Sequence, residues 1–188
     1  HVEEVFVTWA ARKLNRPVRW IADRTEGFLT DEQAREMHIS AELGLDADGK
    51  FTALKLRWDC NLGAYNSGRS GWGVGNIGGI AGTYLIPAIA AECHGIMTHT
   101  VPTAAYRGAG RPEATYAIER LIDVAARELG ISPYELRRRN LIPPEAMPYK
   151  TALTFTYDCG EFEGNMKLAA ELSEFDKFPA RRAEAEAR

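Results

Sequence analysis

Apolar and polar residues alternate with two different periods along this chain, and these periods predict its strands and helices. Every second residue is apolar between residues 37 and 45, and residues 51–60 repeat the alternation. A period of two is typical of strands that bury one face and expose the other. Residues 46–49 read Asp-Ala-Asp-Gly, which favours a tight turn. The two runs therefore predict a β-hairpin, and residues 88–97 predict a further strand.

Other segments show the spacing of helices with one buried face. Pro112 is expected at the first position of the longest of these helices, and Gly130 just past its end. Ser132 and Glu135 have the spacing of a capping box, in which each residue would satisfy a free amide of the other's turn. The helical segments, in chain order, are residues 2–14, 112–129, a second helix from Pro133, a segment from Phe162 to Leu172, and residues 180–188.

The connecting segments are less regular. Residues 18–22 predict a short buried strand, residues 23–36 a polar surface connection, and residues 143–160 an irregular, Pro-rich stretch. Residues 63–83 hold eight of the 17 glycines, which indicates either a close backbone approach to a ligand or another segment, or a long flexible loop. Together the elements predict an α+β fold with a mixed or antiparallel sheet and flanking helices.

Composition narrows the class of protein. The 188 residues are 45% hydrophobic and 26% charged, values typical of a globular chain with a real core. The net charge of −3 gives no basic field for nucleic acid, and no apolar run approaches the roughly 20 residues of a membrane span. Three scattered cysteines indicate neither a disulfide framework nor a metal site, and favour a reducing cytoplasm. Both ends lie in helical patterns, so we expect a fragment of a longer protein.

Several candidate motifs have plain structural explanations. Gly73, Gly75 and Gly78 match a dinucleotide fingerprint by spacing, but neither a strand before them nor a helix after them is predicted. Residues 137–139, three arginines, are expected on a solvated or interhelical face. The four histidines lack the spacing of metal ligands.

The segment AYRGAGRPEA (105–114) carries the strongest chemistry. It places two arginines and two glycines immediately before a helix, where unpaired amides and the positive end of the helix dipole favour anions. Arg107 would add a fork of hydrogen-bond donors. The alternative is an ordinary glycine loop whose arginines make structural salt bridges.

This segment resembles the signature of the molybdenum-binding large subunit of the xanthine dehydrogenase/aldehyde oxidase family, in its carbon-monoxide-dehydrogenase-like branch. The resemblance extends over nearly the whole chain. It includes RPVRW (16–20), DRTE (23–26), GAY (63–65), YLIP (84–87), IERLID (118–123), SPYELR (132–137) and YDCG (157–160).

The resemblance implies a molybdopterin-dependent oxidoreductase that hydroxylates an aldehyde or aromatic N-heterocycle with water-derived oxygen. Its cofactor would be molybdenum-molybdopterin, in the cytosine dinucleotide form found in bacterial relatives. Electrons would pass to 2Fe-2S clusters and FAD on partner subunits, in a dimer of heterotrimers. The family's glutamate base would lie beyond Arg188, so the fragment alone is expected to be inactive.

Residue by residue, the resemblance implies cofactor contacts for Tyr106, Arg107, Gly108 and Gly110, with Arg107 at the molybdenum centre. Gly108 stands where carbon monoxide dehydrogenases carry a copper-binding cysteine, so that chemistry is not expected. The remaining implied positions, in the substrate pocket, are Ala109 and Gly75.

Ala109 and Gly75 replace the phenylalanine and arginine that bind purines in xanthine dehydrogenases, which points away from xanthine. Two further departures are His99, where the family has asparagine, and Asn61 (or Asp59), where it has aspartate.

The expected division is residues 1–142 as part of a molybdopterin-binding domain and residues 143–188 as a connecting segment that begins the next portion. Two rival functions remain open. One is a non-catalytic, cofactor-free α+β assembly or binding module of the same ancestry, and the other is a stand-alone anion-binding domain.

Overall fold

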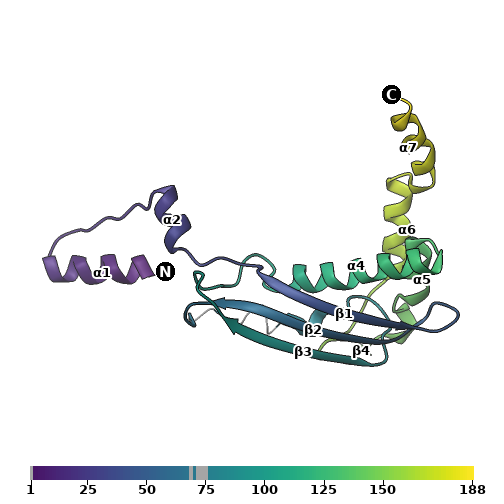
Figure 1. The fold of residues 1–188 in the computed structure, drawn as a ribbon, viewed down its shortest axis with the longest axis horizontal. Coiled ribbons are helices and arrows are strands. Elements are labelled where there is room, and N and C mark those ends of the chain that lie inside the picture. The colour runs from purple at the N-terminus through teal and green to yellow at the C-terminus, as the bar shows by residue number, and fades with distance from the viewer. Residues whose placement is uncertain (1, 68–69, 71–75) are drawn as a thin grey trace.

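The computed structural model describes residues 2–67, 70 and 76–188, and leaves aside the side chain of Val2. The described part is α+β, as expected, with helices around small sheets (Figure 1). Its elements, in chain order, are α1 (Val2–Leu14), α2 (Arg24–Thr30), β1 (Met37–Leu45), β2 (Phe51–Gly63), η1 (Asn76–Gly79), β3 (Ile89–Met97), α4 (Arg111–Leu129), α5 (Pro133–Asn140), η2 (Pro144–Ala146), β4 (Tyr149–Lys150), β5 (Thr156–Tyr157), α6 (Phe162–Leu172), η3 (Phe175–Lys177) and α7 (Phe178–Glu186).

The main sheet is mixed and has the order β1-β2-β3. The predicted hairpin is confirmed: β1 runs antiparallel to β2, with Met37 opposite Cys60 and Leu43 opposite Leu54. The predicted third strand is also confirmed, and β3 runs parallel to β2. The hairpin turn closes on Gly49, whose φ of +76° is a conformation that glycine adopts without strain.

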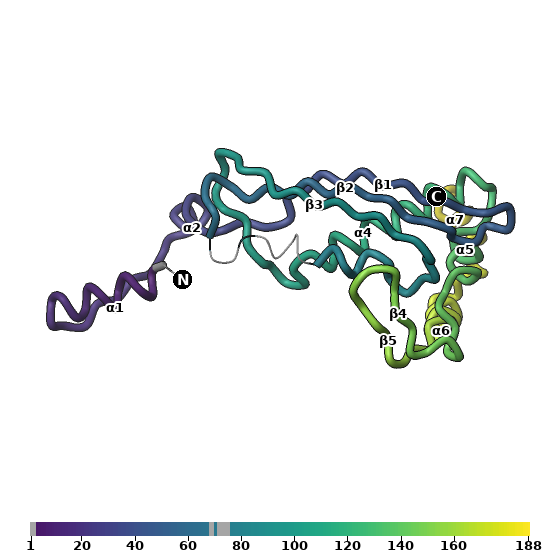
Figure 2. The backbone as a smooth tube through the Cα atoms, turned by 90° about the horizontal axis from the view of Figure 1, so that it is seen from below, coloured from purple at the N-terminus to yellow at the C-terminus, as the bar shows by residue number. Residues whose placement is uncertain are grey.

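The core lies between one face of this sheet and α4, which lies along that face (Figure 2). Trp58 of β2 is completely buried, as is Ile122 of α4, because their apolar periodicities face each other. The other face of β2 is polar and carries Lys55 and Arg57. The fully buried side chains, besides Trp58 and Ile122, include Leu54, Ile80, Ile86, Ile118, Leu136 and Ile142.

Two expectations about the N-terminal part are wrong, and a third is incomplete. Residues 18–22 form no strand. Residues 23–36 lie at the surface as expected, but they include the short helix α2, whose N-terminus is capped by Asp23 through a hydrogen bond from the Glu26 amide. The apolar side of α1 is not buried, since Phe6 is 59% exposed and Trp9 is 53% exposed. This N-terminal arm extends away from the sheet (Figures 1 and 2).

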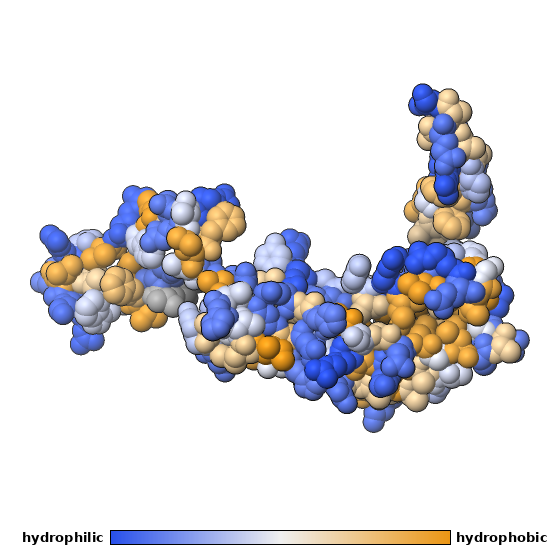
Figure 3. Space-filling model, in the orientation of Figure 1, coloured by the Kyte–Doolittle hydropathy of each residue, from blue (hydrophilic) through white to orange (hydrophobic). Residues whose placement is uncertain are grey.

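The C-terminal part also projects from the core. The short strands β4 and β5 lie within the stretch predicted to be irregular, and α6 and α7 confirm the helical spacing near the C-terminus. Both helices rise away from the sheet in Figure 1. The space-filling view shows apolar side chains on the surfaces of both arms (Figure 3). The exposed large apolar residues of the two arms include Val5, Phe6, Trp9, Ile21, Phe28, Leu29, Leu168, Leu172, Phe175 and Phe178.

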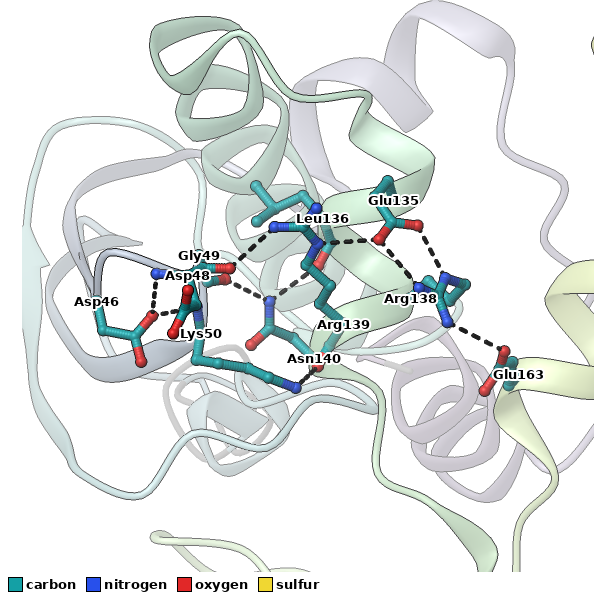
Figure 4. Close-up of polar contacts among 10 residues, drawn as sticks. All are labelled: Asp46, Asp48, Gly49, Lys50, Glu135, Leu136, Arg138, Arg139, Asn140 and Glu163. Carbon is teal, nitrogen blue, oxygen red and sulfur yellow. Dashed lines mark hydrogen bonds and ion pairs between the residues drawn. The ribbon is translucent and has the colours of Figure 1, made fainter.

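Polar contacts fasten α5 to the hairpin turn (Figure 4). Asn140 is 1% exposed, accepts a hydrogen bond from the Phe51 amide at 2.8 Å and donates to the Gly49 carbonyl at 2.9 Å. Glu135 does not form the predicted capping box with Ser132. Its carboxylate pairs instead with Arg138 and Arg139. In the described part of the chain, no helix is both long and apolar enough to cross a bilayer.

Candidate cofactor-binding site

The turn that leads into α4 contains five of the residues expected at the site, Tyr106 to Gly110. Gly108, Ala109 and Gly110 all have positive φ angles, of 91°, 43° and 91°. The helix begins at Arg111, so Pro112 is its second residue and not its first. Two of the amides expected to face an anion are used inside the turn. Ala109 donates to the Tyr106 carbonyl at 2.8 Å, and Arg111 donates to the Gly108 carbonyl at 3.1 Å.

Gly108 is held where no larger residue fits without a shift. A Cβ atom on this residue would lie 2.7 Å from both Cδ and Cγ of Pro112, and the positive φ would add backbone strain. The proline that follows the turn therefore requires glycine at position 108. A cysteine at this position would need a different backbone.

Arg107 and Arg111 stand on either side of the glycine turn, and both are exposed. Within the described residues, neither guanidinium takes part in a hydrogen bond or an ion pair. The alternative interpretation, in which the arginines of this loop serve as structural salt bridges, is therefore not supported for these two. Their N–H groups are therefore free to donate hydrogen bonds to an anion. Guanidinium groups bind the oxygens of such anions well, because they combine positive charge with several donors.

Arg35 holds the turn from the segment before β1. Its Nη2 donates to the carbonyl oxygen of Arg107 at 2.6 Å, and its Nη1 lies 3.1 Å from Oε1 of Glu113. The same guanidinium lies over the ring of Tyr106, 5.2 Å from the centroid. One side chain thus contacts the turn at two residues and the first turn of α4 at a third.

Several hollows lie at or beside the turn. A small cavity of about 20 Å³, room for about one water molecule, lies among Cys60, Asn61, Ala109 and other residues of the turn. A larger groove of about 560 Å³ runs between β1 and α4 and is lined mainly by apolar side chains. Its lining includes Arg35, Ile39, Pro112, Tyr116, Leu121 and Val124.

The glycine-rich segment reaches the turn at one described point. Gly75 lies outside the described residues, so its expected place in the substrate pocket stays a prediction. The next residue, Asn76, donates from its side-chain amide to the carbonyl of Ala109. Close backbone approach, the first of the two interpretations of residues 63–83, occurs at Gly63, where a Cβ would lie 2.4 Å from Cα of Pro102.

Cys60 lines the small cavity, and Cys93 lies beside it on the neighbouring strand β3, with the two Sγ atoms 4.0 Å apart. Both are free thiols. Burial raises the pKa of the Cys60 thiol to about 12, and the neighbouring Cys93 contributes to this rise. Cys60 is therefore a protonated core residue and not a nucleophile.

Asn61 and Asp59 have separate environments. Asn61 is 8% exposed, and its side-chain oxygen Oδ1 accepts hydrogen bonds from the Gly63 amide and the Thr98 hydroxyl, each at 2.7 Å. Asp59 lies beside His94 and Arg57, whose hydrogen bonds lower the pKa of its carboxyl. Asn61 therefore organises the end of β2 near the site, while Asp59 belongs to a surface ion pair.

The other motifs have structural roles. Arg137 binds α4 through Glu119 at 2.7 Å and Asp123 at 2.8 Å. Of the two roles expected for the arginine run, a solvated or an interhelical face, the interhelical one is confirmed for Arg137. In the described residues, histidines, cysteines and carboxylates form no group of three suited to a metal ion.

Sequence reasoning missed Arg35, Glu113 and Asn76 as neighbours of the turn. No local pattern marks Arg35, because its importance comes from a contact with a segment far along the chain. Glu113 stands in the quoted segment itself, where an acidic residue in the first turn of a helix is common and gives no sign of a partner far along the chain.

Known proteins provide independent evidence about the family of this chain. Residues 1–141 match the family described as molybdopterin cofactor-binding domain. The chain is 36% identical over 182 residues to the gamma subunit of the 6-hydroxypseudooxynicotine dehydrogenase complex of Paenarthrobacter nicotinovorans, covering 94% of this chain and 23% of that protein. It is 35% identical to the carbon monoxide dehydrogenase large chain of Hydrogenophaga pseudoflava, covering 93% of this chain and 22% of that protein.

A solved structure extends the likeness to three dimensions. The crystal structure of quinoline 2-oxidoreductase from Pseudomonas putida 86 superposes with a TM-score of 0.92 at 41% identity, and covers 100% of this chain and 24% of that one. The chain thus spans about a quarter of the length of the relatives that it matches.

Proposed function

From the premise that the chain belongs to the molybdopterin cofactor-binding domain family, we propose that it forms one wall of the molybdenum site in the large subunit of a molybdenum hydroxylase. The observation that carries the proposal is a pair of exposed guanidiniums beside a glycine turn, those of Arg107 and Arg111, which have no partner among the described residues. This donor set fits a cofactor whose oxygen and phosphate groups are anionic.

Each residue of the turn has a role in this proposal. Arg107 would lie at the molybdenum centre and donate hydrogen bonds to its anionic groups, while Tyr106, Gly108 and Gly110 would line the cofactor. Ala109 and Gly75 would lie in the substrate pocket. When bound, the molybdenum–pterin group supplies a two-electron oxidation with water-derived oxygen. The chain's own part is to hold the cofactor and to present fixed positive charge where negative charge develops.

The substrate class proposed for the parent protein is an aldehyde or an aromatic N-heterocycle. The small side chain of Ala109 supports this choice, since it offers no ring on which a purine could stack. Glycine at position 108 argues against a copper site of the carbon monoxide dehydrogenase kind, because the turn leaves no room for a cysteine side chain.

We extend the proposal to the assembly. Small-molecule oxidation would deliver electrons to a 2Fe-2S subunit and an FAD subunit, in a dimer of heterotrimers, with the pterin in its cytosine dinucleotide form. Names of relatives such as "subunit gamma" and "large chain" support a multi-subunit complex. Three free cysteines support a reducing, cytoplasmic location. The family match over residues 1–141 supports the proposed domain boundary near residue 142.

The test is Arg107→Ala in the full-length large subunit. The loss of a positioned donor at a reacting centre costs roughly 10²-fold or more in turnover. We expect turnover with a dye acceptor to fall by about that factor, while the folded structure is kept because the side chain is exposed and contacts no partner in the described part of the chain. Molybdenum content, circular dichroism and kcat/KM are the measurements.

Arg127→Ala is the matched control, since Arg127 is also an exposed guanidinium without a partner among the described residues, at the far end of α4. Normal metal content and turnover in Arg107→Ala would refute the role of Arg107. A full-length wild-type protein that holds no molybdenum after expression in a host that makes the cofactor would instead favour the non-catalytic assembly module.

A further inference from the structure

Arg35 combines an unusual backbone conformation with a central position at the site. Its φ of +70° is uncommon for a residue that carries a Cβ, and Ala109 in the turn shares this property. A non-glycine residue keeps a positive φ only where surrounding contacts hold its backbone in place, and such residues often occur at functional sites. The flanking backbone is pinned on one side, because the Gln33 amide donates to the Pro102 carbonyl at 3.1 Å and the Ala104 amide donates to the Gln33 carbonyl at 2.8 Å.

The guanidinium of Arg35 makes contacts that a lysine could not reproduce together. It reaches the Arg107 carbonyl, the Glu113 carboxylate and the Tyr106 ring at once. A planar fork with donors on both nitrogens suits this task, whereas an ammonium is a single point charge. Arg35 therefore fixes the backbone on which Arg107 is carried.

The carboxylate of Glu113 needs a positive partner. Its side chain is only 11% exposed, and Oε1 pairs with Arg35. Its Oε2 is buried and has no hydrogen-bond partner among the described residues. Without Arg35, an uncompensated negative charge would lie under the turn that is proposed to receive an anionic cofactor, and both burial and repulsion would oppose it.

We propose that Arg35 is a positioning residue for the cofactor turn: it ties the Arg107 carbonyl in place and neutralises Glu113, so that the charge presented at residues 106–111 stays positive. The statement that the turn receives a cofactor rests on the proposed function. The statement that Arg35 holds the turn in place, its mechanical part, rests only on the contacts of Arg35.

The mechanical part is tested by hydrogen exchange of the full-length large subunit prepared without cofactor. In Arg35→Ala we expect amides of residues 106–111 to exchange at least about fivefold faster, because a tether is lost and the turn opens locally. Peptides from β2 should not change. Unchanged exchange at residues 106–111 would overturn the proposal, and this readout does not depend on whether the protein binds molybdenum.

The electrostatic part is tested by rescue. In the cofactor-loaded complex, Arg35→Ala is expected to lower molybdenum content several-fold, and the double variant Arg35→Ala/Glu113→Gln should recover at least half of the loss, because the amide removes the buried charge. A double variant as poor as Arg35→Ala would overturn the charge argument. A wild type without molybdenum would refute the proposed function instead, while the exchange result would still decide the tether.

Arg35→Lys covers the case in which Arg35→Ala does not fold. Lysine keeps the charge but loses the fork, so molybdenum content should stay near the wild-type level while exchange at residues 106–111 rises. Exchange as slow as in the wild type would overturn the proposal, since it would mean that any cation suffices. Arg127→Ala serves as the control and is expected to change neither readout.

Discussion

Gly63, the last residue of β2, shows at the scale of a single residue how the strand is joined to the segment that leads into the cofactor turn. Its φ is +83°, and a Cβ would lie 2.4 Å from Cα of Pro102 and 2.5 Å from the carbonyl oxygen of Val101. Backbone atoms cannot move aside as a side chain can. Glycine is therefore required here for both conformation and space.

Gly63→Ala is expected to separate the two segments. The left-handed conformation costs about 1–2 kcal/mol for a residue with a Cβ, and the collision with backbone adds about 1–3 kcal/mol. Gly130→Ala is the matched control, because Gly130 has a φ of +65° but nothing within 4 Å of its would-be Cβ. Hydrogen exchange of residues 98–104 in the full-length subunit should speed up clearly in the first variant and little in the second. Equal effects would contradict the steric argument.

Cys60 gives a prediction about pH. Because burial raises its pKa to about 12, the native thiol should resist iodoacetamide at pH 8 and react only after unfolding in guanidinium. In the native state the thiol stays protonated above pH 9, whereas the unfolded thiol loses its proton near the ordinary cysteine pKa of 9.0. The native state then binds more protons, so this residue lowers stability as pH rises from about 9 towards 12.

The measurement is the thermal midpoint of the full-length subunit across that pH range, together with mass spectrometry of the alkylated peptide. Cys60→Ala should flatten the alkaline part of the curve, although it leaves a small cavity. Rapid alkylation of native Cys60 would show that the thiol is accessible and contradict its burial.

At the scale of elements, Asn140 is the link between α5 and the hairpin. Its side chain accepts a hydrogen bond from the buried Phe51 amide. It also donates to the carbonyls of Gly49 and Leu136, each at 2.9 Å (Figure 4). A buried polar group with its partners satisfied specifies one arrangement, and removal of one partner leaves the others unpaired.

Asn140→Ala should therefore destabilise the junction by about 2–4 kcal/mol, because each buried group left without a partner costs about 1–3 kcal/mol. The expected result is faster exchange in residues 46–52 and in α5. Asn165→Ala, at an exposed position in α6, is the control and should change stability by less than about 0.5 kcal/mol. Similar losses in both variants would mean that Asn140 does not carry the junction.

Elements whose patterns are local could be predicted from the sequence, and those that depend on distant partners could not. The hairpin, β3 and α4 follow from apolar periodicity alone, because the core they bury is their own. Residues 18–22 are apolar enough for a strand, but no neighbouring strand is present in the described part to pair with them. The capping box at Ser132 failed because Arg138 and Arg139 compete for Glu135 and hold the pKa of its carboxyl at about 2.

The candidate site divides in the same way. The turn at residues 106–110 could be predicted from the sequence alone, because glycines and arginines directly before a helix favour anion binding. Its support could not, because Arg35 and Asn76 reach it only through the tertiary fold. The helix also begins one residue earlier than expected, at Arg111, so the amides that are free to bind a ligand differ from those expected.

At the scale of the whole molecule, both arms expose apolar side chains that a core would normally cover. Phe6 and Trp9 contact each other in α1 with ring centroids 5.8 Å apart, yet more than half of each is exposed. Leu172 is 78% exposed in the other arm. Surfaces of this kind mark contacts with other protein. Since the chain spans about a quarter of its relatives, we expect the remainder of the large subunit to cover them.

The isolated chain of 188 residues should therefore self-associate and should not oxidise aldehydes or N-heterocycles with a dye acceptor. Self-association follows from the exposed arms, and inactivity follows from the resemblance, which places the glutamate base beyond Arg188. Light scattering after gel filtration measures the first and dye reduction the second. Trp9→Ser with Leu172→Ser should shift the distribution towards monomer, while Lys167→Ser on the polar side of α6 should not. A monomeric wild-type chain would show that the arms fold back on their own core, and turnover would show that residues 1–188 contain a complete catalytic set.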